Sequence, residues 1–468
     1  MDIKLTFLGA SENVTGSRYQ LEVNNTRILI DCGLYQERQF ADRNWDPFPT
    51  DPASFDCVLL THAHLDHCGL LPKFVAEGFN GKIYATSASC ELVKIITQDS
   101  AKIMAQDAQF KARRHKKQNK KSKHPNKPLY TIEDALKCAS LFQRVKYQTD
   151  TQIADGISIK LAPTGHILGA ASIMMTITKE GETRTILFSG DVGRWDVPIL
   201  KDPFQHEQAD YMLIESTYGD STHEDNSHIQ GKLADVINET HRAGGNVIIP
   251  AFAVERSQEI LYHLNELQVN KRIPKLMTIL DSPMAIKATK VFQNNPQMYD
   301  EEMTDYMQKE QSPFNFGGLQ MTETATESKT INSIRGTAII MAGSGMCTGG
   351  RIKHHFVNNI SRKECTVLFV GYQAFGTLGR LILEGKKNVR LFGQNFPVKA
   401  RIERIHGFSG HADQNELLRF IEKFKTPPKQ TFIVHGEKDT AQVFKKFLKD
   451  KKGWDCTVPK YKETITLN

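Results

Sequence analysis

The sequence predicts an α/β protein of more than one domain, and three observations support this. Short apolar runs bounded by glycine and aspartate, such as residues 185–190 and 338–342, predict strands. They alternate with stretches of helical pattern, such as residues 90–105 and 257–267, which is typical of α/β folds. At 468 residues, the chain is long enough for two to three domains with substantial cores.

The apolar run at residues 55–60, a predicted buried strand, leads directly into His62, His64, Asp66 and His67. Two imidazoles one residue apart can face one cation. The following carboxylate and third imidazole can hold a second cation about 3.5–4 Å away. Nitrogen and oxygen ligands without a thiolate suit Zn²⁺, with Mn²⁺ or Fe²⁺ as second choices. A lone histidine at a strand end is more often structural, but this group of four predicts a metal site.

Further potential ligands follow other predicted strands. Each could singly be a turn residue or a buried core histidine. Together with the first group they amount to a ligand set for two metals. They are Asp31 after residues 27–30, His166 after 161–165, Asp191 after 185–190, and His435 after 431–434.

In chain order, Asp31, residues 62–67, His166 and Asp191 resemble the four signature motifs of the metallo-β-lactamase fold. Later segments resemble the three motifs of its β-CASP subfamily of nucleases. These motif residues are Glu215 in residues 213–219, His411 in residues 408–413 and His435 in residues 434–437. Family-like blocks also occupy residues 250–256, 281–285, 344–351 and 371–380. Phe375 departs from the family, in which a polar or acidic residue is expected.

The resemblance runs from about residue 3 to about residue 465 and implies a four-layer αββα hydrolase fold with an inserted α/β domain. Residues 1–207 would form the first part of the metallo-β-lactamase domain, with a basic insertion at 111–127. Residues 208–395 would form the β-CASP domain. Residues 396–468 would return to the first domain, because His435 must reach the metals. We therefore expect neither the N-terminal RNA-binding domains of archaeal relatives nor the long C-terminal extension of ribonuclease J.

The resemblance also implies the metal chemistry. His62, His64 and His166 would hold one Zn²⁺, and Asp66, His67 and His435 would hold the other, with Asp191 bridging both. Two such cations make a hydroxide available near neutral pH for in-line attack on a phosphodiester. As a ligand of one of these cations, Asp66 also counts among the catalytic residues.

Three further residues would support this reaction. Asp31 would orient a ligand histidine by accepting its hydrogen bond. His411, oriented and charged by Glu215, would protonate the leaving 3′-oxygen as the general acid, and the product would carry a 5′-phosphate.

Two glycine-rich turns after predicted strands are candidates for binding RNA phosphates, because consecutive glycines can direct backbone N–H groups toward an anion. The first turn carries Ser344, Thr348 and Arg351, and the second carries Thr377 and Arg380. Either turn alone could be an ordinary turn. Ser409 could donate to a phosphate or to a local turn.

Residues 111–127 contain nine lysines and arginines and no phenylalanine, tyrosine or tryptophan. This composition predicts contact with the phosphate backbone without base reading, and Lys116, Lys117, Lys120 and Lys121 are the main candidates. The alternative is a solvated loop without a role. The segment carries more charge than the net +7 of the chain, so the basic balance is local.

The remaining observations concern location. The eight cysteines include no C-x-x-C pair and are expected to be buried and reduced, which favours the cytoplasm. No apolar run approaches the roughly 18–20 residues of a membrane span, and no signal peptide precedes the first strand. We therefore expect no membrane partner. The oligomeric state stays open, with a homodimer as one option.

His435 favours RNA as the substrate. An imidazole at this third β-CASP motif resembles the RNA-processing branch, whereas DNA-repair members tend to carry an aliphatic residue at the same position. The resemblance is to compact prokaryotic members related to the endonuclease of pre-mRNA 3′-end cleavage. It implies a ribonuclease, endonucleolytic and with 5′-exonuclease activity left open, in RNA processing or decay. The alternatives are a DNA-directed nuclease of the same subfamily, a small-molecule metallo-hydrolase and an inactive scaffold.

Overall fold

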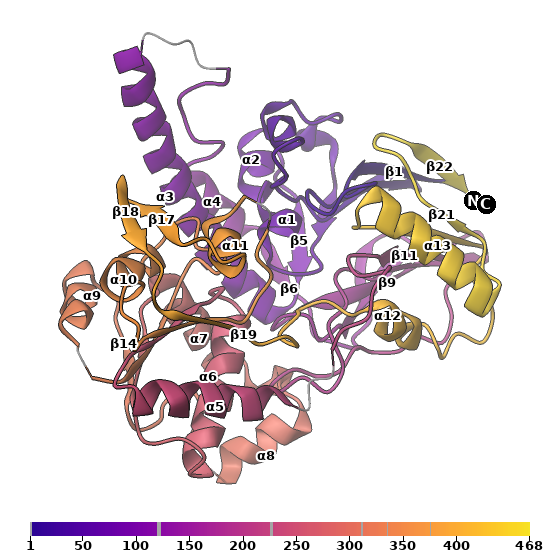
Figure 1. Cartoon of the computed structure of the whole chain (residues 1–468). Helices are drawn as coiled ribbons and strands as arrows, with labels where there is room; N and C mark the ends of the chain where they lie inside the picture. The colour runs from indigo at the N-terminus through magenta and orange to yellow at the C-terminus, as the bar shows by residue number, and fades with distance from the viewer. Residues whose placement is uncertain (1, 119–122, 225–227, 310–311, 335, 375) are drawn as a thin grey trace. The chain divides into compact units, whose positions relative to one another are not determined.

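The computed structural model describes residues 2–118, 123–224, 228–309, 312–334, 336–374 and 376–468. The chain forms two compact units. The metallo unit combines Met1–Thr222 with His411–Asn468, and the β-CASP unit comprises His223–Gly410. Each unit is described by itself below, and Figure 1 labels its elements.

Two sheets form the centre of the metallo unit, each with seven strands among the described residues. The first has the order β22 (Thr464–Leu467), β1 (Ile3–Gly9), β2 (Arg18–Val23), β3 (Thr26–Ile30), β4 (Cys57–Leu59), β5 (Lys82–Ala85) and β6 (Phe142–Arg144). The second has the order β21 (Cys456–Thr457), β20 (Gln430–Val434), β11 (Tyr211–Glu215), β10 (Glu182–Phe188), β9 (Ala171–Lys179), β8 (Ile157–Pro163) and β7 (Thr151–Ala154).

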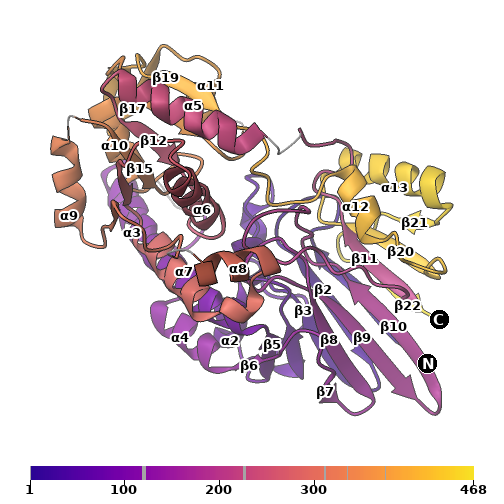
Figure 2. The ribbon, with the colours of Figure 1, turned by 90° about the horizontal axis from the view of Figure 1, so that it is seen from below.

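A single apolar core joins the two sheets. Phe7 and Leu59 of the first sheet belong to the same buried cluster as Leu161, Phe188 and Phe432 of the second. Strand β8 shows the alternation, because Ile157, Ile159 and Leu161 are buried while Ser158 and Lys160 between them are partly exposed. The sheets therefore pack face to face, as Figure 2 shows from below.

Helices cover the outer faces and complete four layers. The helices of the metallo unit are α1 (Leu65–Cys68), α2 (Leu71–Ala76), α3 (Ser87–Gln118), α4 (Ile132–Ser140), α12 (Gln414–Phe420) and α13 (Lys438–Lys452). Phe420 of α12 and Phe444 of α13 pack with Ile433 and Met212 on the outer face of the second sheet. Helices α1 to α4 lie beside the first sheet (Figures 1 and 2). The predicted αββα fold class is confirmed.

The parallel strands of each sheet bring their carboxyl ends to one edge of that sheet. β3, β4 and β5 run parallel in the first sheet, and β10, β11 and β20 run parallel in the second. Ile30 pairs with Leu59, and Glu215 pairs with Val434. The residues that follow these strands, which include Asp31 and His435, therefore emerge at the carboxyl edges of the sheets.

The β-CASP unit contains a parallel six-stranded sheet and a hairpin among the described residues. The sheet order is β14 (Leu319–Met321), β13 (Met277–Leu280), β15 (Ala338–Ala342), β12 (Val247–Pro250), β16 (Thr366–Phe369) and β19 (Arg401–Arg404), and the hairpin is β17 (Asn388–Leu391) with β18 (Gln394–Pro397). The helices are α5 (Ile229–Arg242), α6 (Arg256–Val269), α7 (Pro283–Asn294), α8 (Glu301–Lys309), α9 (Ala325–Thr330), α10 (Ile352–Asn359) and α11 (Leu378–Leu383).

The unit boundaries differ from those expected at residues 207/208 and 395/396. β11 pairs with β10 and β20 and so belongs to the metallo unit, while β19 pairs with β16 and belongs to the β-CASP unit. Each boundary therefore lies about 15 residues later along the chain, at 222/223 and 410/411.

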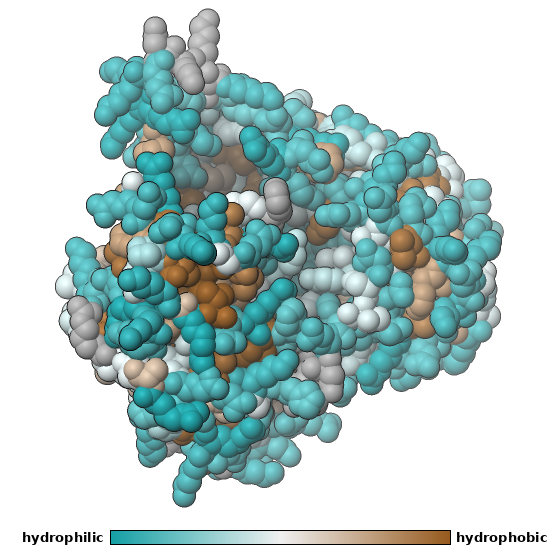
Figure 3. Space-filling model, in the orientation of Figure 1, coloured by the Kyte–Doolittle hydropathy of each residue, from teal (hydrophilic) through white to brown (hydrophobic). Residues whose placement is uncertain are grey.

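Helix α3 is longer than the expected helical stretch of residues 90–105. It continues to Gln118 and takes the first half of the basic segment with it. Its far end is a hydrophilic projection in Figure 3. Among the described residues, no helix combines the length and the apolar character needed to cross a lipid bilayer.

Candidate metal centre

Two ligand-bearing positions have an unusual backbone. Asp31 has φ 59° directly after β3, and His435 has φ 51° directly after β20. Non-glycine residues in this left-handed region cost about 1–3 kcal/mol and persist where the surroundings fix them. The turn aims both side chains away from the strand direction and into the space between the two carboxyl edges.

Four of the predicted ligands converge in a first cluster. His62 Nε2 lies 3.2 Å from His64 Nδ1, and His166 Nε2 lies 2.9 Å from the same atom. Asp191 Oδ2 lies 3.4 Å from His62 Nε2 and 3.5 Å from His166 Nε2. In a tetrahedral zinc site with bonds of about 2.0–2.1 Å, ligand atoms stand about 3.3 Å apart. The cluster therefore has the dimensions of such a coordination shell.

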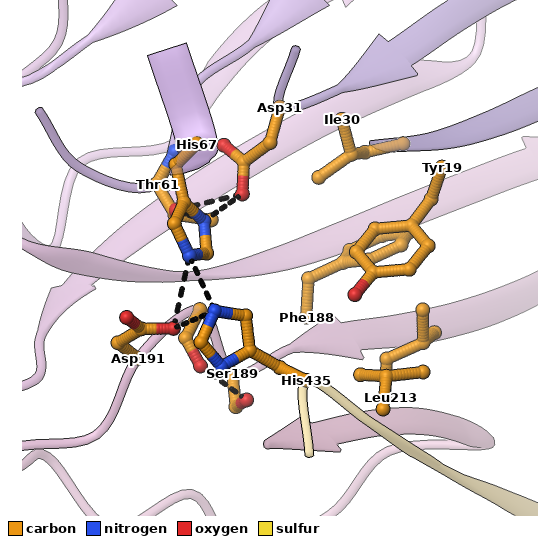
Figure 4. A pocket seen from close by; sticks show the side chains of 12 residues that line it. Tyr19, Ile30, Asp31, Thr61, His67, Phe188, Ser189, Asp191, Leu213 and His435 are labelled. Carbon is orange, nitrogen blue, oxygen red and sulfur yellow. Dashed lines mark hydrogen bonds and ion pairs between the residues drawn. The ribbon is translucent and has the colours of Figure 1, made fainter. Parts of the chain in front are cut away.

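A second cluster lies on the other side of Asp191. His67 Nε2 lies 3.1 Å from His435 Nε2, and Asp66 Oδ2 lies 3.6 Å from that His435 atom. Asp191 Oδ1 lies 3.1 Å from His67 Nε2 and 3.6 Å from His435 Nε2. Figure 4 shows His67, Asp191 and His435 turned toward one another. One carboxylate thus presents one oxygen to each cluster.

The buried Asp191 carboxylate lacks a conventional partner. Its side chain is 1% exposed, and neither oxygen accepts a hydrogen bond of good geometry from the described residues. A buried anion without donors is costly, so a cation between this carboxylate and the imidazoles fits the site. Burial favours the neutral acid, but the charges of His435 and His67 outweigh it and hold the pKa of Asp191 well below its usual value.

The protonation of the histidines suits metal binding. Burial first, and neighbouring imidazoles second, hold the pKa of His62 well below its usual value, and burial also lowers the pKa of His64. Their nitrogen lone pairs are therefore free at neutral pH. For His67, burial is outweighed by Asp191 and Asp31, which raise its pKa, so this position attracts positive charge.

Hydrogen bonds at the ring nitrogen that points away from Asp191 orient His67. His67 Nδ1 donates to Asp31 Oδ2 at 2.7 Å, which leaves its Nε2 facing Asp191. Thr61 donates to Asp31 from its backbone N–H at 2.8 Å and from its hydroxyl at 2.9 Å. The structure thus places Asp31 beside His67, one of the predicted ligands. Partners of this kind fix the tautomer and position of a metal ligand.

Sequence reasoning missed two hydroxyl residues. Besides holding Asp31, Thr61 lies with its Oγ1 3.1 Å from His62 Nδ1, and Thr217 Oγ1 lies 3.1 Å from His435 Nδ1. Thr61 directly precedes a ligand, and Thr217 stands two positions after Glu215. A hydroxyl beside a motif residue was the only signal that could have found them.

His411 and Glu215 form a separate pair beside the first cluster. His411 Nδ1 lies 3.2 Å from Glu215 Oε1 and 3.9 Å from Asp191 Oδ2. Glu215 is completely buried and also accepts backbone N–H bonds from Val192 at 2.7 Å and Thr217 at 3.1 Å. Burial lowers the pKa of His411, but Glu215 outweighs burial and raises it to about 9.

His411 is more exposed than three of the imidazoles predicted as ligands. Its side chain is 22% exposed, whereas those of His62, His67 and His435 are at most 3% exposed. Asp191, Glu215 and His411 also come within 4.8 Å of one another, so the same atoms could serve as a third ligand group.

The glycine-rich turns of the β-CASP unit use their polar groups internally. Arg351 donates to Asp281 at 2.6 Å and to the carbonyl oxygens of Thr322 at 2.9 Å and Glu323 at 2.7 Å. Ser344 Oγ lies 3.3 Å from Thr348 Oγ1. These contacts explain how the first turn is held, and phosphate binding by its residues stays a prediction.

The polar groups of the second turn also bond to neighbouring residues of the β-CASP unit. Thr377 accepts the backbone N–H of Arg380 at 3.3 Å and so caps α11, and the Arg380 guanidinium donates to Glu384 at 2.7 Å. Arg380 remains 41% exposed. Phe375 lies outside the described residues, and Ser409 is partly exposed. Phosphate contacts by this turn and by Ser409 also stay predictions.

The basic segment is partly ordered onto the metallo unit. Lys116 and Lys117 are exposed on the last turn of α3, and Lys120 and Lys121 lie outside the described residues. Beyond them, His124 stacks on Trp45 with ring centroids 5.2 Å apart. The segment is therefore helical up to Gln118, and the lysine and arginine side chains of its described residues are exposed.

Comparisons with known proteins agree with this arrangement. A domain of the metallo-β-lactamase superfamily matches residues 20–192, a β-CASP domain matches residues 257–382, and a Zn-dependent metallo-hydrolase RNA specificity domain matches residues 395–459. A solved structure, a protein of unknown function from Enterococcus faecalis, is similar over 100% of both chains with a TM-score of 0.58 and 11% identity, which supports the fold.

Two curated proteins are similar over nearly the whole chain. Ribonuclease TTHA0252 of Thermus thermophilus is 34% identical over 95% of this chain and 96% of its own length. Transcription termination factor FttA of Methanocaldococcus jannaschii is 30% identical over 94% of this chain and 68% of its own length. With these matches and a complete set of signature residues in place, the chain belongs to the β-CASP subfamily of the metallo-β-lactamase fold.

Proposed function

We propose that this protein is a zinc-dependent ribonuclease that hydrolyses RNA phosphodiester bonds at a site for two metal ions. The observation that carries the proposal is Asp191, whose two oxygens face separate ligand clusters. The first ion would be held by His62, His64 and His166, and the second by Asp66, His67 and His435. When bound, the ions would lower the pKa of water toward neutrality and offset the charge of the phosphate.

His411 supplies the proton for the leaving 3′-oxygen. With a pKa of about 9, the imidazole carries its proton at neutral pH, and its partial exposure leaves it open to a substrate. The buried Glu215 carboxylate holds the ring and balances its charge through the contact at Nδ1. The product would then carry a 5′-phosphate. A positioned general acid of this kind contributes about 10²–10⁴-fold to a rate.

RNA is the substrate that the comparisons favour. One relative is named as a ribonuclease, and the C-terminal matching domain is described as an RNA specificity domain. His435 lies in the second ligand cluster, as the RNA-processing branch requires. A DNA-directed nuclease and a small-molecule hydrolase remain the alternatives. We infer endonucleolytic cleavage in RNA processing or decay and a cytoplasmic location, whereas 5′-exonuclease activity and a homodimer stay open.

The direct test uses one RNA labelled at either end, prepared with a 5′-monophosphate or a 5′-hydroxyl, together with DNA of the same sequence. Internal products that carry a 5′-phosphate are the expected result, with DNA cleaved much more slowly. Equal cleavage of DNA would contradict the choice of RNA. Mononucleotides released from the 5′ end would show the exonuclease activity.

Asp31→Asn tests the support of the second cluster. The amide cannot accept the His67 Nδ1 proton as strongly, and loss of such a partner typically weakens metal affinity by about 10–100-fold. We expect this loss in a competition titration with a coloured zinc chelator. Asp150→Asn is the control, because Asp150 is an exposed residue that pairs with Lys160 at 3.1 Å. Unchanged affinity in Asp31→Asn would argue against its orienting role.

The basic segment gives a prediction for binding alone. Changing Lys116, Lys117, Lys120 and Lys121 to alanine should weaken binding to all RNA sequences alike. If each contacts one phosphate, the slope of log affinity against log salt should flatten by about 3, at about 0.7 per contact. The rate at saturating RNA should change little. Lys445, Lys446, Lys449 and Lys451 of α13 provide a charge-matched control, and an unchanged slope would make the segment a solvated projection.

A further inference from the structure

The hairpin of β17 and β18 in the β-CASP unit turns through an unfavourable residue. Leu391 pairs with Gln394, and the two residues between them, Phe392 and Gly393, have φ 48° and φ 87°. Positive φ at both positions is the mark of a type I′ turn, in which asparagine, aspartate or glycine is preferred at the first position. A bulky aromatic residue there is a conformational outlier that raises the free energy of the folded hairpin.

The same side chain is left open to solvent. Phe392 is 57% exposed, although Val389 and Leu391 before it are buried in the core of the unit. The hairpin lies beside α10 (Figure 1), and the His354 ring of that helix stacks on Phe392 with centroids 4.5 Å apart and an interplanar angle of 26°. The ring is therefore supported by α10 while more than half of its surface stays accessible to a further planar ring.

The surroundings of Phe392 are strongly basic. Lys353 Nζ of α10 lies 5.3 Å from the centroid of its ring. Residues 385–399 contain no acidic residue and four cations, all of them exposed. We call these four the hairpin cations: Lys386, Lys387, Arg390 and Lys399. Neither they nor Lys353 form an ion pair with a described carboxylate, so their charge is available to an anionic partner.

The strain and the exposure at Phe392 do not serve the fold. Asparagine before glycine would form the same turn without strain and would expose no aromatic ring. Strained residues cluster at sites that bind ligands, and an exposed ring among unpaired cations is the combination that binds single-stranded nucleic acid. Any base can stack on the ring, while the cations contact the phosphates on either side of it.

We propose that the tip of this hairpin binds single-stranded RNA, with one base stacked on Phe392 and the neighbouring phosphates in contact with Lys353 and the hairpin cations. The proposal rests on RNA as the substrate given above. None of these residues belongs to the candidate metal centre. The site therefore adds affinity for unpaired RNA of any sequence and takes no part in the chemical step.

Phe392→Asn separates binding from folding. The melting temperature should change little, because the better turn residue offsets the lost contact with His354. The Kd for a labelled single-stranded RNA should rise by about 5–150-fold, the usual effect of losing one base stack. Phe392→Tyr keeps a ring and should bind as the wild type does. All chains are full length and carry His411→Ala to slow cleavage. A lower melting temperature with an unchanged Kd would overturn the proposal.

Salt dependence separates the cations from the ring. Changing Lys386, Lys387 and Arg390 together to glutamine should flatten the slope of log affinity against log salt by about 2, at about 0.7 per lost phosphate contact. Phe392→Asn removes no charge and should leave the slope as it is in the wild type. An unchanged slope in the triple variant would overturn the proposal, because the hairpin cations would then not contact RNA.

Met277→Asn is the control for loss of an exposed apolar side chain. Met277 is 40% exposed at the start of β13 in the same unit, and its substitution should leave the Kd unchanged. A duplex RNA of the same sequence is the control for the ligand, because its bases are already stacked on one another. Wild type and Phe392→Asn should bind the duplex equally. An equal loss of affinity in Met277→Asn, or for the duplex in Phe392→Asn, would overturn the proposal.

Two outcomes separate this proposal from the function on which it rests. If the wild type cuts RNA and Phe392→Asn binds RNA unchanged, only the hairpin site fails. Loss of self-association in that variant would then show that the hairpin contacts protein. If the wild type neither binds nor cuts RNA, the proposed function fails and the hairpin site fails with it.

Discussion

Asp191→Asn should remove metal from both clusters and strongly reduce RNA cleavage. The carboxylate presents one oxygen to each cluster, with Oδ2 near His62 and His166 and Oδ1 near His67 and His435. An amide offers one oxygen and no charge. The rate should fall by at least about 10²–10³-fold, the usual loss when an electrostatic stabiliser is removed.

Elemental analysis of purified protein gives the direct readout. We expect close to two zinc ions per wild-type chain and a clear reduction in Asp191→Asn and in His64→Ala, with chelation of the wild type abolishing cleavage. Asp210→Asn is the control, because Asp210 accepts from Thr185 at 2.8 Å near the opposite end of the same sheet. Full RNA cleavage by metal-free protein would end the hydrolytic assignment.

His411→Ala and Glu215→Gln should slow cleavage without loss of metal. Removal of a general acid typically costs about 10²–10⁴-fold. His411 Nδ1 contacts Glu215 at 3.2 Å, and Glu215 is held by the backbone of Val192 and Thr217, so Glu215→Gln should weaken the acid without moving the ligands. Single-turnover rates at saturating RNA measure the effect, and metal content is measured in the same samples.

Metal content decides between two roles for His411. Asp191, Glu215 and His411 lie close enough together to form a ligand group of their own. If His411→Ala loses an ion along with its activity, His411 is a ligand and the proton must come from another group. If the ions stay while the rate falls, the acid assignment stands.

The ligand positions could be predicted because their signal is local. Asp31, His62, His166, Asp191 and His435 each stand within three residues after a strand, and parallel neighbours such as β10, β11 and β20 bring their carboxyl ends to one edge. The assignment of strands to the two units depended on distant parts of the chain. β11 belongs to the metallo unit because it pairs with residues 430–434, and no local pattern encodes that partner.

Arg351 illustrates the same limit at a single side chain. In the sequence it is a cation in a glycine-rich turn, which is typical of phosphate binding. In the fold it meets Asp281, a buried carboxylate from another strand end that also contacts Thr322, Ser328 and His355. The strength of that network depends on tertiary packing, and a sequence pattern does not reveal it.

The order in which the chain is synthesised has a consequence for when the enzyme becomes active. The last segment, His411–Asn468, supplies β22 to the first sheet, β20 and β21 to the second, and both His411 and His435. A nascent chain that has not yet released this segment from the ribosome lacks His411 and His435 at the candidate site. Domains generally fold in the order of synthesis. His411 and His435 are thus synthesised after every other residue of the candidate site.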